Sequence, residues 1–176
     1  MDSRLLALLL AAALSPACAR TTLKGSAADA ASDPRPAAEL DFWDAVAAQK
    51  AVSNHDALRA LLLLAEKGGA ARDFQGCLGI ARERGWVGAD AALAANETAE
   101  AGWIARAICL ELGIKGGLTM RLAGAHPRYA LRELIHMGMM PQKTRRQSMS
   151  GLELIALMSR AEDYQKGAGT APRGDL

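Results

Sequence analysis

The chain repeats one short pattern, in which an apolar segment ends at a glycine and a second apolar segment follows. Gly85-Trp86-Val87 is matched by Gly138-Met139-Met140, and Thr98-Ala99-Glu100 by Gly151-Leu152-Glu153, both at an offset of 53 residues (138 − 85 and 151 − 98). Glycine readily adopts the left-handed conformation that ends a helix. One such unit cannot bury its apolar face alone, so neighbouring units must stack. The pattern therefore predicts an all-α fold of helix–loop–helix repeats.

The composition also favours helices. Apolar residues make up 51% of the 176 residues but aromatic residues only 4%, and alternating runs of β-branched residues are almost absent. Helices are expected over residues 40–52, 54–67, 74–84, 97–112, 127–137 and 151–164. Their expected N-caps are Ser53, Asp73, Asn96 and Ser150.

Similar helix ends predict that there are three units. Lys67-Gly68-Gly69, Lys115-Gly116-Gly117 and Lys166-Gly167 each close a helix that has an acidic residue near its start. We expect three helix–loop–helix repeats packed as a compact bundle over residues 39–166, followed by a disordered tail at 167–176. Because lysine and glycine are common at any helix end, unrelated helices are the alternative.

Short motifs recur at the helix starts of these units. His126-Pro127-Arg128-Tyr129-Ala130 opens the last unit, and Ser53-Asn54-His55-Asp56, Glu97-Thr98-Ala99-Glu100 and Ser150-Gly151-Leu152-Glu153 open the second helices. Over residues 40–164 the pattern resembles S-layer homology repeats, whose units begin with an aromatic-Ala pair and carry a Thr-Arg-Ala-Glu motif. The resemblance implies a bundle of three units. The motif arginine, which helps to bind anionic cell-wall polymers in that family, is missing from all three units, so the resemblance does not imply polymer binding.

The N-terminus has the pattern of an export signal. Arg4 precedes an apolar run at residues 5–14, and Ser15-Pro16-Ala17 ends that run with small residues. The run is too short to span a bilayer, which takes roughly 20 residues, so residues 1–17 are predicted to be a signal peptide. The segment resembles a bacterial lipoprotein signal, which implies lipidation of Cys18, although Ser15 stands where that pattern usually has leucine. Ordinary secretion, with cleavage before Cys18 or after Ala19, is the alternative.

Residues 18–38 are expected to be a flexible tether, because they lack apolar periodicity and contain Gly25-Ser26, Asp33-Pro34 and Pro36. Together with a lipidated Cys18, a tether would hold the folded domain near a membrane. The expected location is therefore the periplasm or the outer face of the cell envelope.

Six basic residues gather in and around the last unit. They are Arg121, Arg128, Arg132, Lys143, Arg145 and Arg146. If the loop at 141–148 folds back beside the helix at 127–137, these side chains would form a positive cleft for phosphate, uronate or lipid headgroups. A solvated rim with scattered counterions is the alternative.

No residue set typical of catalysis stands out. The three histidines His55, His126 and His136 include no pair one helical turn apart, which excludes the paired-histidine helix of zinc peptidases. The chain also lacks a Gly-x-Ser-x-Gly elbow and a phosphate-binding glycine loop. A net charge of +2 is too small for a nucleic-acid binder. We therefore expect a non-enzymatic protein without a metal or cofactor.

Two kinds of partner fit such an envelope protein. The first expectation is another envelope protein, held by scaffold contacts through exposed leucine and methionine surfaces, with Met137, Met139, Met140 and Met158 as the adaptable contacts. The alternative is an anionic envelope polymer or lipid headgroup at the basic cleft. A periplasmic enzyme or enzyme regulator is a remote third expectation.

Cys77 and Cys109 form an even pair once Cys18 is set apart. In a hairpin made by the middle unit, the start of its first helix and the end of its second would meet. An exported protein would then allow a disulfide between them. Two buried free thiols are the alternative.

Trp86, Trp103 and Tyr129 raise the prospect of stacking on a sugar ring. Trp86 corresponds to Met139 at the offset of 53 residues, however. A position taken by tryptophan in one unit and methionine in another is more simply explained as a plug between helices.

Overall fold

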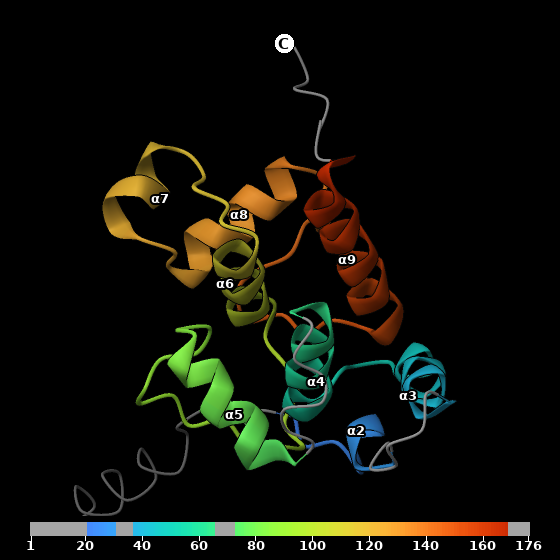
Figure 1. Cartoon of the computed structure of the whole chain (residues 1–176). Coiled ribbons are helices and arrows are strands. Elements are labelled where there is room, and N and C mark those ends of the chain that lie inside the picture. Colours follow the sequence, from blue (N-terminus) through green and yellow to red (C-terminus); the bar gives the residue numbers. More distant parts are fainter. Residues whose placement is uncertain (1–20, 31–36, 66–72, 169–176) are drawn as a thin grey trace, which may run out of the picture.

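The structure, a computed structural model, describes residues 21–30, 37–65 and 73–168. Its elements are α2 (Ala27–Ala30), α3 (Ala37–Ala47), α4 (Asn54–Leu64), α5 (Phe74–Glu83), α6 (Ala101–Glu111), α7 (Leu118–Ala123), α8 (Pro127–His136), α9 (Gly151–Asp163) and the π-helical turn η2 (Tyr164–Ala168). The predicted all-α fold is confirmed for this part of the chain, and the helices pack as one bundle (Figure 1).

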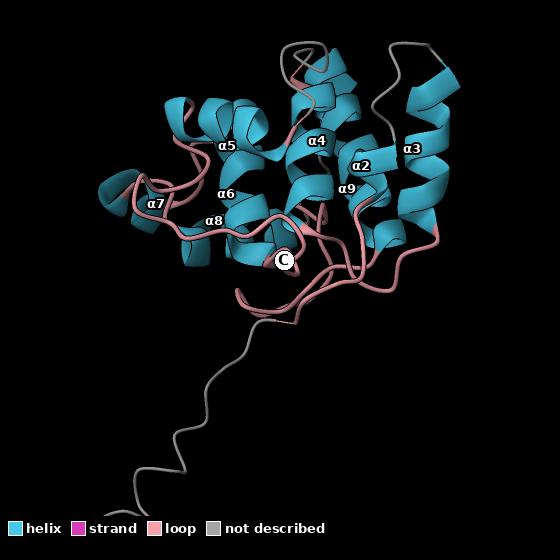
Figure 2. Cartoon of the chain, turned by 90° about the horizontal axis from the view of Figure 1, so that it is seen from below, coloured by secondary structure: helices cyan, strands magenta, loops and turns pink. Residues whose placement is uncertain are grey.

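The starts of α4, α6 and α9 are tied together through the backbone of the segments that precede them. Ala99 N donates to Val52 O at 2.8 Å, Ala101 N to Gln147 O at 2.9 Å, and Val52 N to Met149 O at 2.8 Å. Amides at a helix start have no partner within their own helix. Loop carbonyls and paired loop segments supply partners here, and the loops lie along one side of the helices (Figure 2).

The remaining contacts between the long helices mainly connect different predicted units rather than the two helices of one unit. α5 packs against α4, α8 packs against α6, and α3 packs against α9. The predicted units instead connect α3 to α4, α5 to α6 and α8 to α9. The first helix of each predicted unit therefore lies mainly against the second helix of another. The interpretation as three repeats stays a prediction.

The core is aliphatic, and α4 lies at its centre. Nine of the eleven residues of α4 are buried. Leu58, Leu61 and Leu62 are fully buried, and burying each leucine contributes about 1.5–3 kcal/mol. Phe42 from α3 and Trp86 from the turn after α5 are each only 1% exposed and add two fully buried rings.

α5 and α8 carry the first half of the sequence repeat in register. Both helices are 10 residues long. Gly85 and Gly138 follow them with φ angles of 70° and 71°. The amides of Trp86 and Met139 then donate back to helix carbonyls at 2.9 and 2.8 Å. The glycine turn and the apolar plug are therefore the same structure in both places.

The second half of the repeat is out of register. α6 begins at Ala101 and α9 at Gly151, which are 50 residues apart rather than 53 (151 − 101). The N-cap of α6 is Glu100, not Asn96. Residues 97 and 98, expected in the first helical turn, instead form isolated bridges with Thr22 and Ser53. Backbone pairing between distant segments has overridden the local capping preference.

The segment at 21–30 differs from the flexible tether expected over residues 18–38. Thr22 bridges to Glu97, and α2 packs against α3 and α4. Ser26 Oγ and Ala28 N donate to one carboxylate oxygen of the buried Asp56 at 2.6 and 2.8 Å. A buried polar partner holds this segment, and apolar periodicity does not report such a contact. The structured part of the chain thus includes residues well before Glu39.

Several expectations fall on residues outside the described ranges: the signal peptide at 1–17, the lipidation site Cys18, the helix end at Lys67-Gly68-Gly69 and the tail from residue 169 onward. In the described part of the chain, none of the helices is both long and apolar enough to cross a bilayer. α7 was not predicted from the sequence.

Candidate functional site

An open cleft of about 620 Å³ lies between the first turns of α8 and the loop that leads to α9. Its lining residues are His126, Arg128, Tyr129, Leu131, Arg132, Lys143, Thr144 and Arg145. The loop at 141–148 lies folded back beside α8, which is the arrangement on which the predicted basic cleft depends.

The cleft brings together four of the six basic residues singled out from the sequence, namely Arg128, Arg132, Lys143 and Arg145. Arg121 instead lines a separate hollow of about 550 Å³, together with Lys115. Arg146 is exposed on the loop but does not line the cleft.

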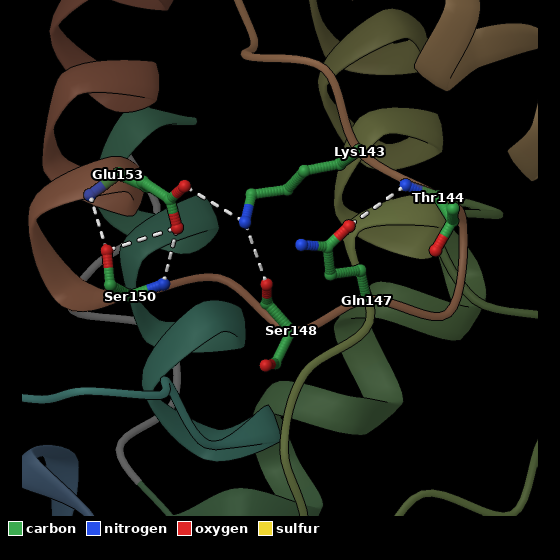
Figure 3. Close-up of polar contacts among 6 residues, drawn as sticks. All are labelled: Lys143, Thr144, Gln147, Ser148, Ser150 and Glu153. Atoms are coloured by element: carbon green, nitrogen blue, oxygen red, sulfur yellow. Dashed lines mark hydrogen bonds and ion pairs between the residues drawn. The ribbon is translucent and has the colours of Figure 1, made fainter.

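Lys143 ties the loop to the start of α9 (Figure 3). Its Nζ lies 2.9 Å from Glu153 Oε1 and donates to Ser148 O at 3.0 Å. The Lys143 side chain is only 7% exposed. Thr144 N donates to Gln147 Oε1 at 3.2 Å and closes the turn between them. Lys143 is therefore a neutralised cation that shapes the wall of the cleft, rather than a free charge for a ligand.

Glu153 is held by a capping box at the start of α9. Ser150 N donates to Glu153 Oε2 at 2.8 Å, and Glu153 N donates to Ser150 Oγ at 3.3 Å. Burial acts to raise the pKa of Glu153, but hydrogen bonds from Ser150 and Lys143 outweigh it and keep the pKa of this carboxyl below its usual range. Glu153 is therefore charged at neutral pH and holds Lys143 in place.

The start of α6 supports the other end of the loop. Gly102 N donates to Arg145 O at 2.9 Å. A Cβ at position 102 would lie only 2.9 Å from Arg145 O and 3.0 Å from Arg145 Cβ, so glycine permits this close approach. Since α8 also packs against α6, one helix positions both walls of the cleft.

Arg128, Arg132 and Arg145 are the cations of the cleft that stay available. All three are exposed, and none has an ion pair with any described residue. None of the described residues that line the cleft is acidic. Guanidinium groups bind phosphate and carboxylate through paired, charge-assisted hydrogen bonds. The arrangement is suited to an anionic group held between α8 and the loop.

Two rings lie beside the arginines in the lining of the cleft. The His126 and Tyr129 rings lie with their centroids 5.8 Å apart. His126 is the N-cap of α8, and its Nδ1 accepts a hydrogen bond from Arg128 N at 3.3 Å. The ring is thereby held by the helix start beside the arginines.

The methionines do not form the exposed contact surface expected for a scaffold. Met139, Met140 and Met158 are 5%, 3% and 3% exposed, and Met137 is half-buried. The chain turns back at Gly138, which directs Met139 and Met140 into the core. The expectation that these methionines supply an exposed protein-contact surface is therefore wrong.

The tryptophans and the tyrosine lie in different places. Trp86 and Trp103 line a hollow of about 170 Å³ that Tyr129 does not reach. Trp86 is almost fully buried, which agrees with a plug between helices. Among the buried polar atoms of this hollow's residues, Asn54 Oδ1, Trp103 Nε1 and Arg106 Nε have no protein partner.

Cys77 and Cys109 are both buried, and no disulfide joins them. α5 packs against α4 whereas α6 packs against α8, so the middle unit does not form the hairpin that would bring the two sulfurs together. Cys109 Sγ lies 3.8 Å from Ala130 O on α8. Burial is the main cause that raises the pKa of Cys77 to about 11 and that of Cys109 to about 12.

The described residues contain no group of three or more histidine, cysteine, aspartate or glutamate side chains placed to hold a metal ion. Comparison with known proteins finds no family model, no curated protein and no solved structure that matches this chain.

Proposed function

We propose that the protein is a non-enzymatic binding protein of the cell envelope, whose cleft holds the phosphate or carboxylate groups of an anionic envelope component. The observation that carries this proposal is the convergence of Arg128, Arg132 and Arg145 on one cleft without described acidic partners. Lys143 is engaged by Glu153, so the loop's shape does not depend on the ligand.

The location in the envelope rests on the export-signal pattern at residues 1–17 and on Cys18 as a lipidation site. The binding role is preferred over a methionine-based scaffold because three of the four methionines are buried.

The test is a comparison of two double variants with the same net charge. Arg128→Gln/Arg145→Gln removes one guanidinium from each wall of the cleft, and Arg82→Gln/Arg146→Gln removes two exposed charges outside it. The probes are inorganic phosphate and an oligogalacturonate, and affinity is measured by isothermal titration calorimetry. We expect the cleft variant to bind roughly 10- to 100-fold more weakly and the control to bind like the parent protein.

Binding should also weaken steeply with added salt, because exposed charges are screened. An equal loss of affinity in both variants, or binding that persists at 1 M salt, would contradict the proposal.

A further inference from the structure

α7 presents two exposed leucines on one face. Leu118 and Leu122 are 73% and 81% exposed and lie four residues apart, which places them on the same side of the helix. The other strongly exposed leucines, Leu40 and Leu152, occur singly on α3 and α9. Among the described helices, α7 is therefore the one on which two strongly exposed leucines lie side by side.

α7 is held as a protrusion at the edge of the molecule. It lies beside α8 at the periphery in both views (Figures 1 and 2). Gly116 and Gly124, at φ of 58° and 72°, turn the chain on either side of it. Met120 is 5% exposed and anchors the opposite face of α7, while Gly117 N donates to Glu133 Oε2 at 3.2 Å. The leucines are thus displayed by a segment that is itself anchored.

The sequence around α7 is basic, although the half-buried Glu133 lies against the start of the helix and accepts the hydrogen bond from Gly117 N. Residues 113–132 contain Lys115, Arg121, Arg128 and Arg132 and no aspartate or glutamate. All four cations are exposed. Lys115 and Arg121 face one hollow, and Arg128 and Arg132 face the cleft.

We propose that α7 is an interfacial membrane contact, in which Leu118 and Leu122 insert into an anionic bilayer surface while the four surrounding cations bind lipid phosphates. Exposed leucines flanked by lysine and arginine are the combination that binds at the headgroup boundary. A water-soluble polyanion would engage the cations but leave the leucines in water, so the apolar pair favours a lipid surface. The inference rests on the proposed function and names its partner as an anionic bilayer.

The test uses the full chain with vesicles of phosphatidylglycerol and phosphatidylcholine, and with vesicles of phosphatidylcholine alone, in a co-sedimentation assay. Leu118→Asp/Leu122→Asp removes the apolar pair. Leu40→Asp/Leu152→Asp is the matched control, because those leucines are similarly exposed (70% and 66%) and the charge change is identical. Any contribution of the N-terminal segment is the same in both variants.

We expect the parent protein and the control to bind anionic vesicles, and the α7 variant to bind them on the order of 100-fold more weakly. All three should bind inorganic phosphate alike, because the cleft is unchanged. Equal vesicle binding by the two leucine variants would overturn the inference. A parent protein that binds phosphate and oligogalacturonate but not vesicles would also overturn it. Either result would leave the proposed function intact. The proposed function itself would fail if Arg128→Gln/Arg145→Gln bound phosphate and oligogalacturonate as tightly as the parent protein.

A second readout reports insertion directly. Leu118→Trp and Leu152→Trp place the same fluorophore on α7 and on α9. Anionic vesicles should shift the emission of the α7 variant to shorter wavelength and leave that of the α9 variant unchanged. A shift in neither variant, or the same shift in both, would overturn the inference.

Discussion

Adding one methyl group at Gly151 should strongly destabilise the folded state. Gly151 is the first residue of α9, and its amide donates to Gln49 O at 3.0 Å just after α3. A Cβ at this position would lie 1.6 Å from Val46 O and 2.6 Å from the carbonyl carbon of the same residue. Both obstructing atoms are backbone, so a rotamer change cannot relieve the overlap.

The cost of Gly151→Ala follows from the displacement that it forces. Moving Val46 O to an ordinary contact of 3.4 Å requires a shift of 1.8 Å (3.4 − 1.6). Such a shift breaks the hydrogen bond to Gln49 O, a loss of about 1 kcal/mol. It also loosens Phe42 and Val46, which are 1% and 0% exposed, and each contributes about 1.5–3 kcal/mol when fully buried. We expect the free energy of unfolding to fall by about 3–5 kcal/mol.

The assay is urea unfolding followed by far-UV circular dichroism, with Gly79→Ala as the control. Gly79 lies inside α5, and a Cβ there meets no atom within 4 Å. Since alanine favours helix over glycine, Gly79→Ala should raise the free energy of unfolding by about 0.5–1 kcal/mol. If Gly151→Ala were as stable as the parent, the packing of α3 on the start of α9 would be refuted.

Two further predictions concern titrating groups. The pKa of Glu153 is lowered in the folded state, so the stabilisation from its ionised carboxylate is present above the unfolded pKa of about 4.3 and is lost as the pH falls through the folded pKa. Glu153→Gln should therefore reduce the fall in the free energy of unfolding at acid pH. An unchanged fall would contradict the role of Lys143 and Ser150. Burial raises the pKa of Cys77 and Cys109 to about 11 and 12, so both thiols should stay protonated at pH 8 and react with iodoacetamide far more slowly in the native protein than in urea. Mass spectrometry would detect the modification. Rapid labelling of either native thiol, or a linked pair of peptides without reductant, would contradict two buried cysteines with no disulfide between them.

The sequence predicted the local features of the fold well. The starts of α4, α5, α8 and α9 agree with the expected helices, since Ser53, Asp73 and Ser150 cap them as expected and Pro127 opens α8. The glycine turns at Gly85 and Gly138 are likewise properties of adjacent residues. These features depend on backbone chemistry within one or two helical turns, which short-range patterns report directly.

Features that depend on distant partners were missed. α6 starts four residues later than expected (101 − 97), because Glu97 bridges to Thr22 and Thr98 bridges to Ser53. The segment at 21–30 is docked by Asp56, which lies 28 residues beyond Ala28 in the chain. The role of Lys143 also depends on a partner, since an ion pair with Glu153 removes it from the set of free cations.

The sequence by itself determined that the described chain is helical, where α4, α5, α8 and α9 begin, and which stretch carries the basic residues. Only the tertiary structure decided which helices pair, which methionines are buried, and which arginines share a cleft. The difference has a physical cause: capping, glycine turns and helix propensity act between neighbours, whereas partner choice is decided by burial and backbone pairing between segments far apart in the chain. Gly79 and Gly151 show this most simply, since both are helical glycines in the sequence. Only the fold places Val46 O where a methyl group at position 151 would have to lie.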